Sequence, residues 1–403
     1  GFFGAGGLGI DHITRAVEGI RKSLPEGVGF GVNLLHGNKE DKTVTLLLEK
    51  RVRNVEAAGY MQVTPALVRY RVTGLKRDRN GAVVAPNRII AKVSRPEIAR
   101  RFLCPPPKKL IDKLLGEGMI SSEEAELAGK VSLAADLCVE ADSGGHTDAG
   151  VAYVLMPAMI GLRDDAMNEF GYTEMIHVGA AGGIGTPHAA AAAFILGADF
   201  LVTGSINQCT LEAGTSPEVK DLLQTLDVQD TAYAPAGDMF EMGAKVQVVR
   251  RAVFFPARAN KLYELYTRYN GLHELDYKTR MQLEDRFFQR SFDDIYRDCM
   301  EFYPASRIEE ADRNSKLKMA FVFRWYFGFS TRMALRGVLD QKVNWQIHCG
   351  PSLGAFNRYA EKTGLTDWRN RRVGEIGEGL MEETADLMQR RLLGICSRGS
   401  VHY

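Results

Sequence analysis

The sequence predicts an α/β protein, a (β/α)8 TIM barrel accompanied by a mostly helical substrate subdomain. Short apolar, β-branched runs alternate with helical stretches over the first half of the chain, which is the pattern of a parallel sheet. Several runs end in small-residue or polar turns, and barrel enzymes build their sites from the turns that follow strands. After about residue 238 the alternation stops, and aromatic residues recur at roughly helical spacings, which predicts the subdomain.

Seven strands are expected in the barrel. They are Gly1–Phe3, Val28–Leu34, Val52–Glu56, Ile89–Val93, Leu133–Val139, Met175–Val178 and Phe200–Val202. Helices are expected between or beside them, at Asp11–Lys22, Thr43–Arg51, Glu97–Leu103, Ser122–Gly129, Gly161–Phe170 and Pro187–Leu196. The chain opens on a strand end and a glycine turn, so an eighth strand upstream of Gly1 is expected to complete the barrel. Periodicity alone leaves an open Rossmann-type sheet as the alternative, and the strand count favours the barrel.

Three domains are expected: a cofactor-binding barrel over residues 1–238, a helical insertion or substrate subdomain over 239–330, and C-terminal helices over 331–403 that pack back on the barrel. No alternating strand pattern is seen between residues 239 and 310. An aromatic stripe is the main feature there, with members Tyr263, Tyr266, Tyr269, Phe287, Phe288, Phe292 and Tyr296. Such a stripe is usually core, and the alternative is a groove for an apolar substrate.

Composition excludes several classes of function. The 403 residues are 45% hydrophobic, which is enough to build a large globular core. The net charge of +1 gives no reason to expect nucleic acid or an anionic membrane as the main partner, and no apolar run reaches the length of a bilayer span. Six scattered cysteines without a C-x-x-C pair indicate a reducing, cytoplasmic compartment. No metal site is expected, because the only candidate ligands gather on one loop.

Two glycine-rich turns predict a phosphate site. Gly182, Gly183 and Ile184 follow one strand and precede a helix that begins at Pro187. Gly204-Ser205 follows the next strand along the chain. Glycine lets a phosphate approach backbone N–H groups near a helix start, and barrels commonly form one joint phosphate site from their last two such loops.

The turn Glu140–Asp148 predicts the chemistry. Gly144 and Gly145 leave room for a flat ring, and His146 is then held at a strand end. A lone histidine is more often structural, but this position in a barrel favours catalysis, either as a proton donor or as a donor to a carbonyl oxygen. The histidines expected to be structural are His12, His36, His177, His188 and His273.

Asn33 and Lys92 end two other expected strands. An amide and an ammonium at these positions could hydrogen-bond the carbonyl edge of a cofactor, and the positive charge would stabilise a reduced, anionic ring. The alternative for Lys92 is an ordinary solvated lysine. A Ser-His-Asp hydrolase is disfavoured, because no nucleophile elbow between a strand and a helix is identified in the sequence.

These residues resemble a known superfamily, the FMN barrels of the nitronate monooxygenase (2-nitropropane dioxygenase) type, which include flavin-dependent enoyl-acyl-carrier-protein reductases. The motifs are Gly4–Leu8, Gly31–Asn33, Gly144–His146, Ala180–Ile184 and Gly204–Ser205. Longer blocks resemble the PfaD-type subfamily, the trans-acting enoyl reductases of polyunsaturated fatty acid synthases and trans-acyltransferase polyketide synthases. These blocks are Thr64–Tyr70, Ala91–Pro96, Glu140–Asp148, Ala234–Met242, Phe323–Tyr326 and Cys349–Asn357, and the match covers nearly the whole chain.

The resemblance implies an FMN-bearing barrel that uses NADPH to reduce 2-enoyl thioesters on an acyl carrier protein, with a homodimer as a possible assembly. It implies His146 as the active-site histidine. The FMN residues that it implies are Asn33, Lys92, Gly144, Gly145, Ala180, Gly182, Gly183, Ile184, Gly204 and Ser205. One departure lies after Asp148, where Ala-Gly-Val stands in place of an Asn-Arg-Pro-like segment, and this leaves the substrate range open.

Two other functions remain as alternatives. A nitronate monooxygenase on the same frame would use oxygen and need no carrier protein or nicotinamide, and the long insertion argues against it. A non-catalytic flavin-binding or scaffolding subunit would not need His146 and both phosphate turns.

Overall fold

The computed structural model describes residues 1–398 and divides the chain into two compact units. Unit 1 comprises Gly1–Ala141, Gly150–Ala181 and Ala193–Val202. Unit 2 comprises Asp142–Ala149, Gly182–Ala192 and the chain from Thr203 onward. The division into 1–238, 239–330 and 331–403 stays a prediction, and residues 399–403 of the last segment lie outside the described part.

Unit 1 contains a seven-stranded sheet in which every neighbouring pair is parallel. Its strands, in spatial order, are β1 (Phe2–Phe3), β2 (Gly31–Leu35), β3 (Asn54–Ala58), β6 (Arg88–Val93), β7 (Asp136–Glu140), β9 (His177–Ala181) and β10 (Phe200–Val202). This order confirms the predicted TIM-barrel-like α/β fold. The eighth strand stays a prediction.

The sheet forms because its strands are buried on both faces, as parallel strands normally are. Central residues such as Val32, Val55, Ile89 and Leu137 are fully buried. Several glycines in the strands allow close packing; a Cβ on Gly179, for example, would fall 2.2 Å from the ring of Phe200.

Helices follow most strands of unit 1. They are α1 (Ile10–Ser23), α2 (Glu40–Glu49), α3 (Pro65–Val72), α4 (Pro96–Leu103), α5 (Lys108–Gly116), α6 (Ser122–Leu127), the short 3-10 helix η1 (Ala128–Lys130) and α7 (Ala152–Phe170), and a small hairpin adds β4 (Lys76–Arg77) and β5 (Val83–Val84). The prediction omitted α3 and α5. For α3 the start signal is present, because Thr64 accepts a hydrogen bond from the N–H of Leu67 at 3.2 Å and Pro65 lies in the first turn. The prediction also began α7 too late, because Pro157 lies inside this helix.

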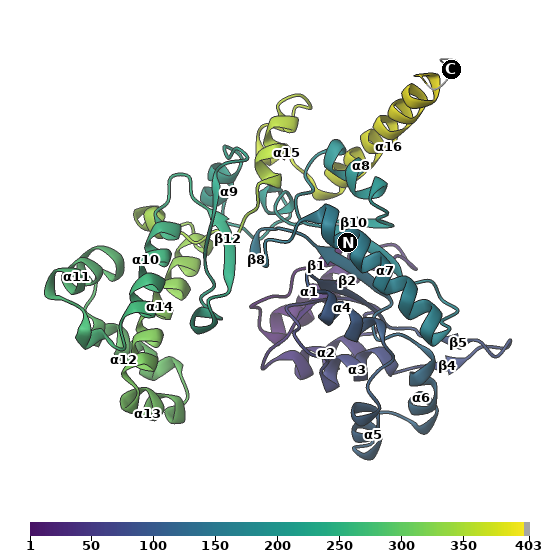
Figure 1. Ribbon diagram of the computed structural model, residues 1–403, viewed down its shortest axis with the longest axis horizontal. Coiled ribbons are helices and arrows are strands. Elements are labelled where there is room, and N and C mark those ends of the chain that lie inside the picture. The colour runs from purple at the N-terminus through teal and green to yellow at the C-terminus, as the bar shows by residue number, and fades with distance from the viewer. Residues whose placement is uncertain (399–403) are drawn as a thin grey trace. The chain divides into compact units, whose positions relative to one another are not determined.

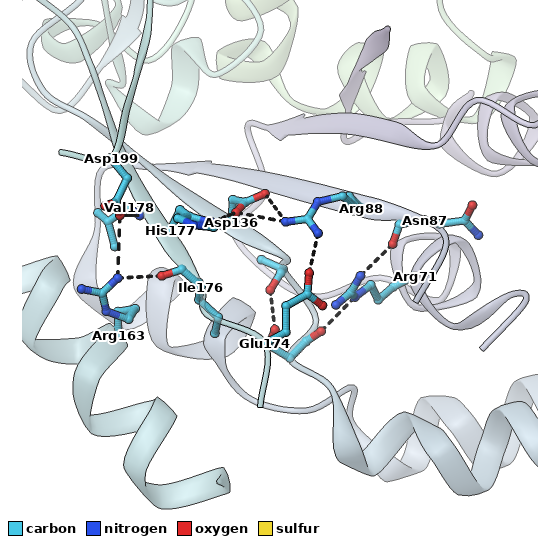
Figure 2. A network of polar contacts seen from close by, with 12 residues as sticks. Arg71, Asn87, Arg88, Asp136, Arg163, Glu174, Ile176, His177, Val178 and Asp199 are labelled. Atoms are coloured by element: carbon cyan, nitrogen blue, oxygen red, sulfur yellow. Dashed lines mark hydrogen bonds and ion pairs between the residues drawn. The ribbon is translucent and has the colours of Figure 1, made fainter. Parts of the chain in front are cut away.

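A polar network ties together the amino ends of three strands of unit 1 (Figure 2). Arg88, at the start of β6, pairs with Asp136 at the start of β7 at 3.0 Å and with Glu174 at 2.5 Å. His177, at the start of β9, lies 3.0 Å from Asp136 through its Nδ1. The amino ends of barrel strands normally serve stability, and catalysis occurs at the opposite edge. The network therefore stabilises the sheet on the side away from the predicted chemistry.

Unit 2 contains a three-stranded antiparallel sheet that the sequence did not predict. Its order is β11 (Thr231–Pro235), β12 (Lys245–Val249) and β8 (Gly145–Thr147). The prediction that residues 239–310 contain no strand was wrong, because β12 lies within them. Five residues give too short an alternation to identify a strand, and β12 is stabilised by partners on both edges, one of them about a hundred residues earlier in the chain.

Unit 2 is rich in helices (Figure 1). They are α9 (Pro217–Leu223), α10 (Phe255–Arg268), α11 (Tyr277–Gln282), α12 (Phe292–Phe302), α13 (Ala305–Arg313), α14 (Ser315–Leu335), α15 (Ser352–Ala360) and α16 (Val373–Arg398). Shorter turns are η2 (Asn207–Cys209), η3 (Phe240–Met242), η4 (Leu272–Glu274), η5 (Leu283–Phe288), η6 (Leu339–Asn344) and η7 (Trp368–Asn370). Residues of α8 (Pro187–Ile195) fall in both units.

Helices α10 to α14 gather into one bundle around an aromatic core (Figure 1). Phe287, Phe288, Phe292 and Tyr296 of the predicted stripe are buried in this core. The stripe's three other tyrosines are partly buried and pack against it. The stripe is therefore core, the more common of the two interpretations. In the described residues, no helix is long and apolar enough to cross a membrane.

Candidate active site

At the carboxyl ends of the strands in unit 1, four polar side chains form a row. Asn33 of β2 donates from Nδ2 to Glu56 of β3 at 2.5 Å. Lys92 of β6 places Nζ 3.4 Å from Glu56 and 3.2 Å from Glu140, the last residue of β7. The sequence predicted Asn33 and Lys92 at this edge. It gave no sign that Glu56 and Glu140 would share the lysine.

The two carboxylates change the electrostatics expected for Lys92. Burial alone would lower its pKa, but Glu140 and Glu56 more than offset burial, so the pKa of Lys92 is raised and the ammonium stays charged. Two carboxylates face this one ammonium. A cofactor ring in this place would therefore meet a hydrogen-bonding network without net positive charge.

The two glycine turns of unit 2 begin directly after two neighbouring strands, β9 and β10, whose last residues are paired. Ala181 pairs with Val202, so Gly182 and the residue before Gly204 emerge side by side at the carboxyl edge. Gly182 and Gly183 have positive φ, at 87° and 74°, which glycine adopts without strain. A Cβ on Gly183 or Gly204 would meet no atom within 4 Å, so open space lies beside both turns. These residues fit a phosphate that approaches bare backbone.

The other residues of the predicted cofactor set have identifiable neighbours. Ile184 is buried after the first turn, and Ala180 is buried within β9 of unit 1. Ser205 is buried, and its Oγ accepts a hydrogen bond from the N–H of Gly350 at 2.9 Å. Ser205 therefore holds the backbone at Gly350 in place.

The loop that carries His146 is held by Asp142 and by backbone packing. Asp142 accepts hydrogen bonds from Thr147 at 2.8 Å and Tyr233 at 2.5 Å, and its Oδ2 lies 3.3 Å from the amide nitrogen of Gln247. A Cβ on Gly144 would fall 2.7 Å from the N of Gly350. The chain therefore requires glycine at position 144 because another backbone segment passes beside it. The sequence analysis expected a flat ring beside Gly144 and did not predict that the backbone at Gly350 lies there.

His146 lies in β8, which places its ring at the edge of the small sheet. Its Nε2 is 2.8 Å from Oδ1 of Asp238. Burial would raise the pKa of Asp238, but the hydrogen bond from His146 and its charge lower the pKa overall. The carboxylate therefore stays ionised and stabilises positive charge on the imidazole. Asp238 lay inside a matched block of sequence, but only the fold shows that it faces His146.

His348 is the main residue that the sequence analysis missed. Its ring lies 6.4 Å from that of His146, centroid to centroid, at an interplanar angle of 81°. Its Nε2 is 2.9 Å from the amide nitrogen of Gln346. Burial lowers its pKa to about 4, and the nearby His146 adds to this effect. The only available signal was its place directly before the matched block Cys349–Asn357.

Both histidines line a cavity of about 480 Å³ within unit 2. Its polar lining includes His146, Asp238, Gln346 and His348. Its apolar walls come from α12 and α14 and the segment after α12, with Phe302, Tyr303, Phe321, Trp325 and Phe327. Volumes of this size are typical of small-molecule sites. The cavity therefore joins a pair of histidines to the helical bundle.

The structure thus distributes the predicted residues over two groups, each within one unit. Asn33, Lys92 and Ala180 belong to unit 1. Unit 2 holds His146 and the remaining glycines, Ile184 and Ser205. Each donor set, taken by itself, fits part of an FMN: the amide and charged side chains of unit 1 suit a flavin ring, and the open glycine turns of unit 2 suit a phosphate.

Several known proteins are similar to this chain in sequence. A family model for the inserted helical domain of (acyl-carrier-protein) S-malonyltransferase matches residues 269–345. The polyketide biosynthesis protein PksE of Bacillus subtilis is 57% identical over 396 residues, which are 97% of this chain and 52% of that protein. ThaF of Burkholderia thailandensis, another polyketide biosynthesis protein, is 54% identical over 99% of this chain and 34% of its own length. A polyunsaturated fatty acid synthase component from a Thraustochytrium species is 43% identical over 91% of this chain and 25% of that protein. The chain therefore spans about half or less of these relatives.

Several solved structures are similar to this chain in fold. The enoyl reductase domain of MlnA, from the macrolactin biosynthesis cluster of Bacillus amyloliquefaciens, superposes with a TM-score of 0.94 at 45% identity, over 98% of this chain and 90% of that chain. FabK from Thermotoga maritima has a TM-score of 0.56 at 18% identity, over 98% of this chain and 87% of its own. A nitroalkane oxidase from Streptomyces ansochromogenes has a TM-score of 0.55 at 15% identity, over 97% and 90%. The last two show a shared fold alone.

Proposed function

The chain belongs to the PfaD-type enoyl reductase family, and from this premise we propose its reaction. It is an FMN-dependent, trans-acting enoyl reductase. It reduces the 2,3-double bond of 2-enoyl thioesters that an acyl carrier protein presents during polyketide or polyunsaturated fatty acid synthesis, and NADPH is the reductant.

One observation carries this proposal: the pair His146–Asp238 opens into an apolar cavity built by the helical bundle. The aromatic walls suit a hydrophobic acyl chain and exclude water from it. Arg324 and Arg332 of α14 also line the cavity, and Arg324 pairs with Glu241 at 3.1 Å. Guanidinium groups favour phosphate, so these arginines suit the phosphodiester of a carrier protein's pantetheine arm.

The residues of the chain have separate tasks in this reaction. When FMN is bound, it supplies the hydride that NADPH provides. Gly182, Gly183 and the turn Gly204-Ser205 would hold the FMN phosphate, and Asn33 and Lys92 would hydrogen-bond its ring. His146 holds a proton that Asp238 stabilises, and its role is to donate that proton to the α-carbon or to polarise the thioester carbonyl.

The decisive experiment is NADPH oxidation by the FMN-loaded, full-length protein without oxygen. The assay is run with and without crotonyl-pantetheine or crotonyl carrier protein, and the product is identified by mass. We expect consumption that depends on the thioester, with a butyryl product. A separate assay in the presence of oxygen measures oxygen uptake with a nitronate. If the thioester has no effect in the first assay and the nitronate causes oxygen uptake in the second, the protein is a nitronate monooxygenase.

A histidine variant tests the site assignment. We expect His146→Ala to slow the enoyl-dependent step by about 10²- to 10⁴-fold, the usual contribution of a positioned acid. FMN content and flavin reduction by NADPH should stay at wild-type levels, because His146 acts on the substrate. His273→Ala, at an exposed histidine outside the cavity, is the matched control. Wild-type turnover by His146→Ala would show that the assignment is wrong.

A further inference from the structure

The register of the small sheet in unit 2 places two histidines on one face. His146 pairs with Val246 of β12, and His348 forms an antiparallel bridge with Val248 of the same strand. Residues two apart along a strand project to the same face, and their directly opposite partners do so with them. His146 and His348 therefore enter the same cavity from one edge of β12.

Hydrogen bonds determine which nitrogen of His348 carries its proton. The hydroxyl of Thr331 donates to Oε1 of Gln346 at 3.1 Å, so the amide nitrogen of Gln346 donates to Nε2 of His348 at 2.9 Å. A nitrogen that accepts a hydrogen bond has no proton, and a neutral ring then carries its proton on Nδ1. Among the residues that the structure describes, none is hydrogen-bonded to this Nδ1.

The surroundings keep the ring of His348 neutral. Gln346 is buried, with 7% of its surface exposed, and burial is the main reason that the pKa of His348 falls to about 4. His146 instead has a carboxylate at 2.8 Å, which favours its charged form. When two titratable groups in one site have opposite environments, one suits proton transfer and the other suits a neutral role.

We propose that His348 donates a hydrogen bond from Nδ1–H to the acyl oxygen of the thioester, while His146 delivers the proton to the α-carbon. This inference rests on the proposed function. It assigns proton donation to His146 and polarisation of the thioester carbonyl to His348. Thr331 and Gln346 are positioning residues, because they act through the tautomer of His348.

The step balances in atoms and electrons. Hydride forms a bond to C3, the C2=C3 π bond breaks, and its electron pair moves toward the acyl oxygen, where Nδ1–H of His348 stabilises the enolate. His146 then gives its proton to C2, the C=O bond re-forms, and His146 takes a proton from solvent. One enoyl thioester, one NADPH and one proton give one saturated thioester and one NADP⁺.

The first test measures the tautomer and needs no turnover. Full-length, FMN-loaded protein is prepared with ¹⁵N-labelled histidine, and His348→Asn identifies the signals of residue 348. We expect the ring to stay neutral between about pH 5 and pH 9, with the proton on Nδ1. A proton on Nε2, or titration near an ordinary histidine pKa, would overturn the proposal. The titratable groups that line the cavity with the two histidines are Asp238, Asp298, Cys299, Tyr303, Arg324 and Arg332.

The second test compares two replacements of His348. In His348→Asn the side-chain amide stands close to the place of Nδ1–H, whereas His348→Leu has no donor. We expect kcat with crotonyl thioester to fall about 10²- to 10³-fold in the leucine variant, as for the loss of one oxyanion donor, and to recover at least about tenfold in the asparagine variant. Flavin reduction by NADPH should be unchanged in both. Equal rates for the two variants would refute the donor role.

Two milder variants keep the proposal testable if His348→Leu fails to fold. Thr331→Ser keeps the hydroxyl, whereas Thr331→Val loses it and frees the amide of Gln346 to rotate. We expect a lower kcat and a mixture of His348 tautomers only in the valine variant, and wild-type behaviour of both would contradict the proposal. If wild-type protein shows no thioester-dependent NADPH oxidation, the proposed function fails, and the ¹⁵N result still reports on the tautomer.

Discussion

The charge of Lys92 depends on two carboxylate partners near the carboxyl edge of the sheet. Its ammonium lies between Glu56 and Glu140, and its side chain is only 23% exposed. Oε1 of Glu56 has no hydrogen-bond partner despite its burial, although Lys92 lies 3.4 Å from it. Removal of the lysine would leave two carboxylates without a compensating charge.

We expect Lys92→Met to lower the free energy of unfolding by about 3 kcal/mol, the lower end for a broken buried pair because the site is partly exposed. The pKa of Lys92 is raised above its ordinary value of 10.5, so the stability that it contributes is fully present below that value and is lost only at higher pH. The loss in the variant should thus be constant from about pH 6 to pH 9.

Urea unfolding at several pH values measures this effect, and Lys92→Arg is the matched control because it keeps the charge. We expect the arginine variant to lose less than about 1 kcal/mol. An equal loss in both variants would show that packing, rather than the positive charge between the two carboxylates, determines the effect.

At the scale of elements, the edge of β12 organises the candidate active site. It pairs with β8, which carries His146, and then with the segment around His348. Gly144 makes this possible, because the backbone at Cys349 and Gly350 passes where its Cβ would stand.

We expect Gly144→Ala to destabilise the protein by at least about 1–3 kcal/mol, since both contacting segments are backbone and cannot rotate away. The midpoint of thermal unfolding should fall, and enoyl reduction should be lost along with the position of His146. Gly214→Ala is the control, because a Cβ there would meet nothing within 4 Å. Equal stability of the two variants would mean that the segments lie farther apart.

Helix α14 supplies one wall of the cavity, and Gly328 is its smallest residue there. We expect Gly328→Leu to raise KM about tenfold for a 2-octenoyl thioester and less than about twofold for the crotonyl thioester, because the added side chain occupies space that only a longer chain needs. Gly377→Leu, at an open position on α16, is the control. An equal change in KM for both thioesters would show that the acyl chain does not bind beside Gly328.

At the scale of the whole molecule, the predicted FMN residues come from both units. A ligand that binds only the folded state stabilises it by RT ln(1 + [L]/Kd), about 2.7 kcal/mol at a hundredfold excess over Kd. We expect FMN to raise the midpoint of thermal unfolding of the full-length apoprotein. Gly204→Ala should remove most of this shift and leave the apoprotein unchanged, because its methyl group enters the open space beside the turn. An undiminished shift would place the phosphate elsewhere.

Much of the barrel could be predicted from the sequence, because strands, helices and glycine turns leave local, periodic signals. The parallel order and the neighbouring glycine turns follow from the alternation of elements. Helix α7 and strand β12 were mispredicted where the local signal conflicts or is short: a proline lies inside the helix, and the strand has five residues. The aromatic stripe was identified as core, and none of its residues lines the cavity, whose aromatic side chains come from other positions.

By itself, the sequence determined the α/β barrel and the family resemblance, and it selected His146 and both glycine turns as site candidates, whose roles stay predictions. Only the tertiary structure decided that Asp238 faces His146, that His348 stands beside it, and that both enter a cavity of the helical bundle. The physical reason is that pairing between β8, β12 and the segment at His348 joins stretches far apart in the chain. Their register depends on the packing of the whole of unit 2, and local periodicity does not encode it.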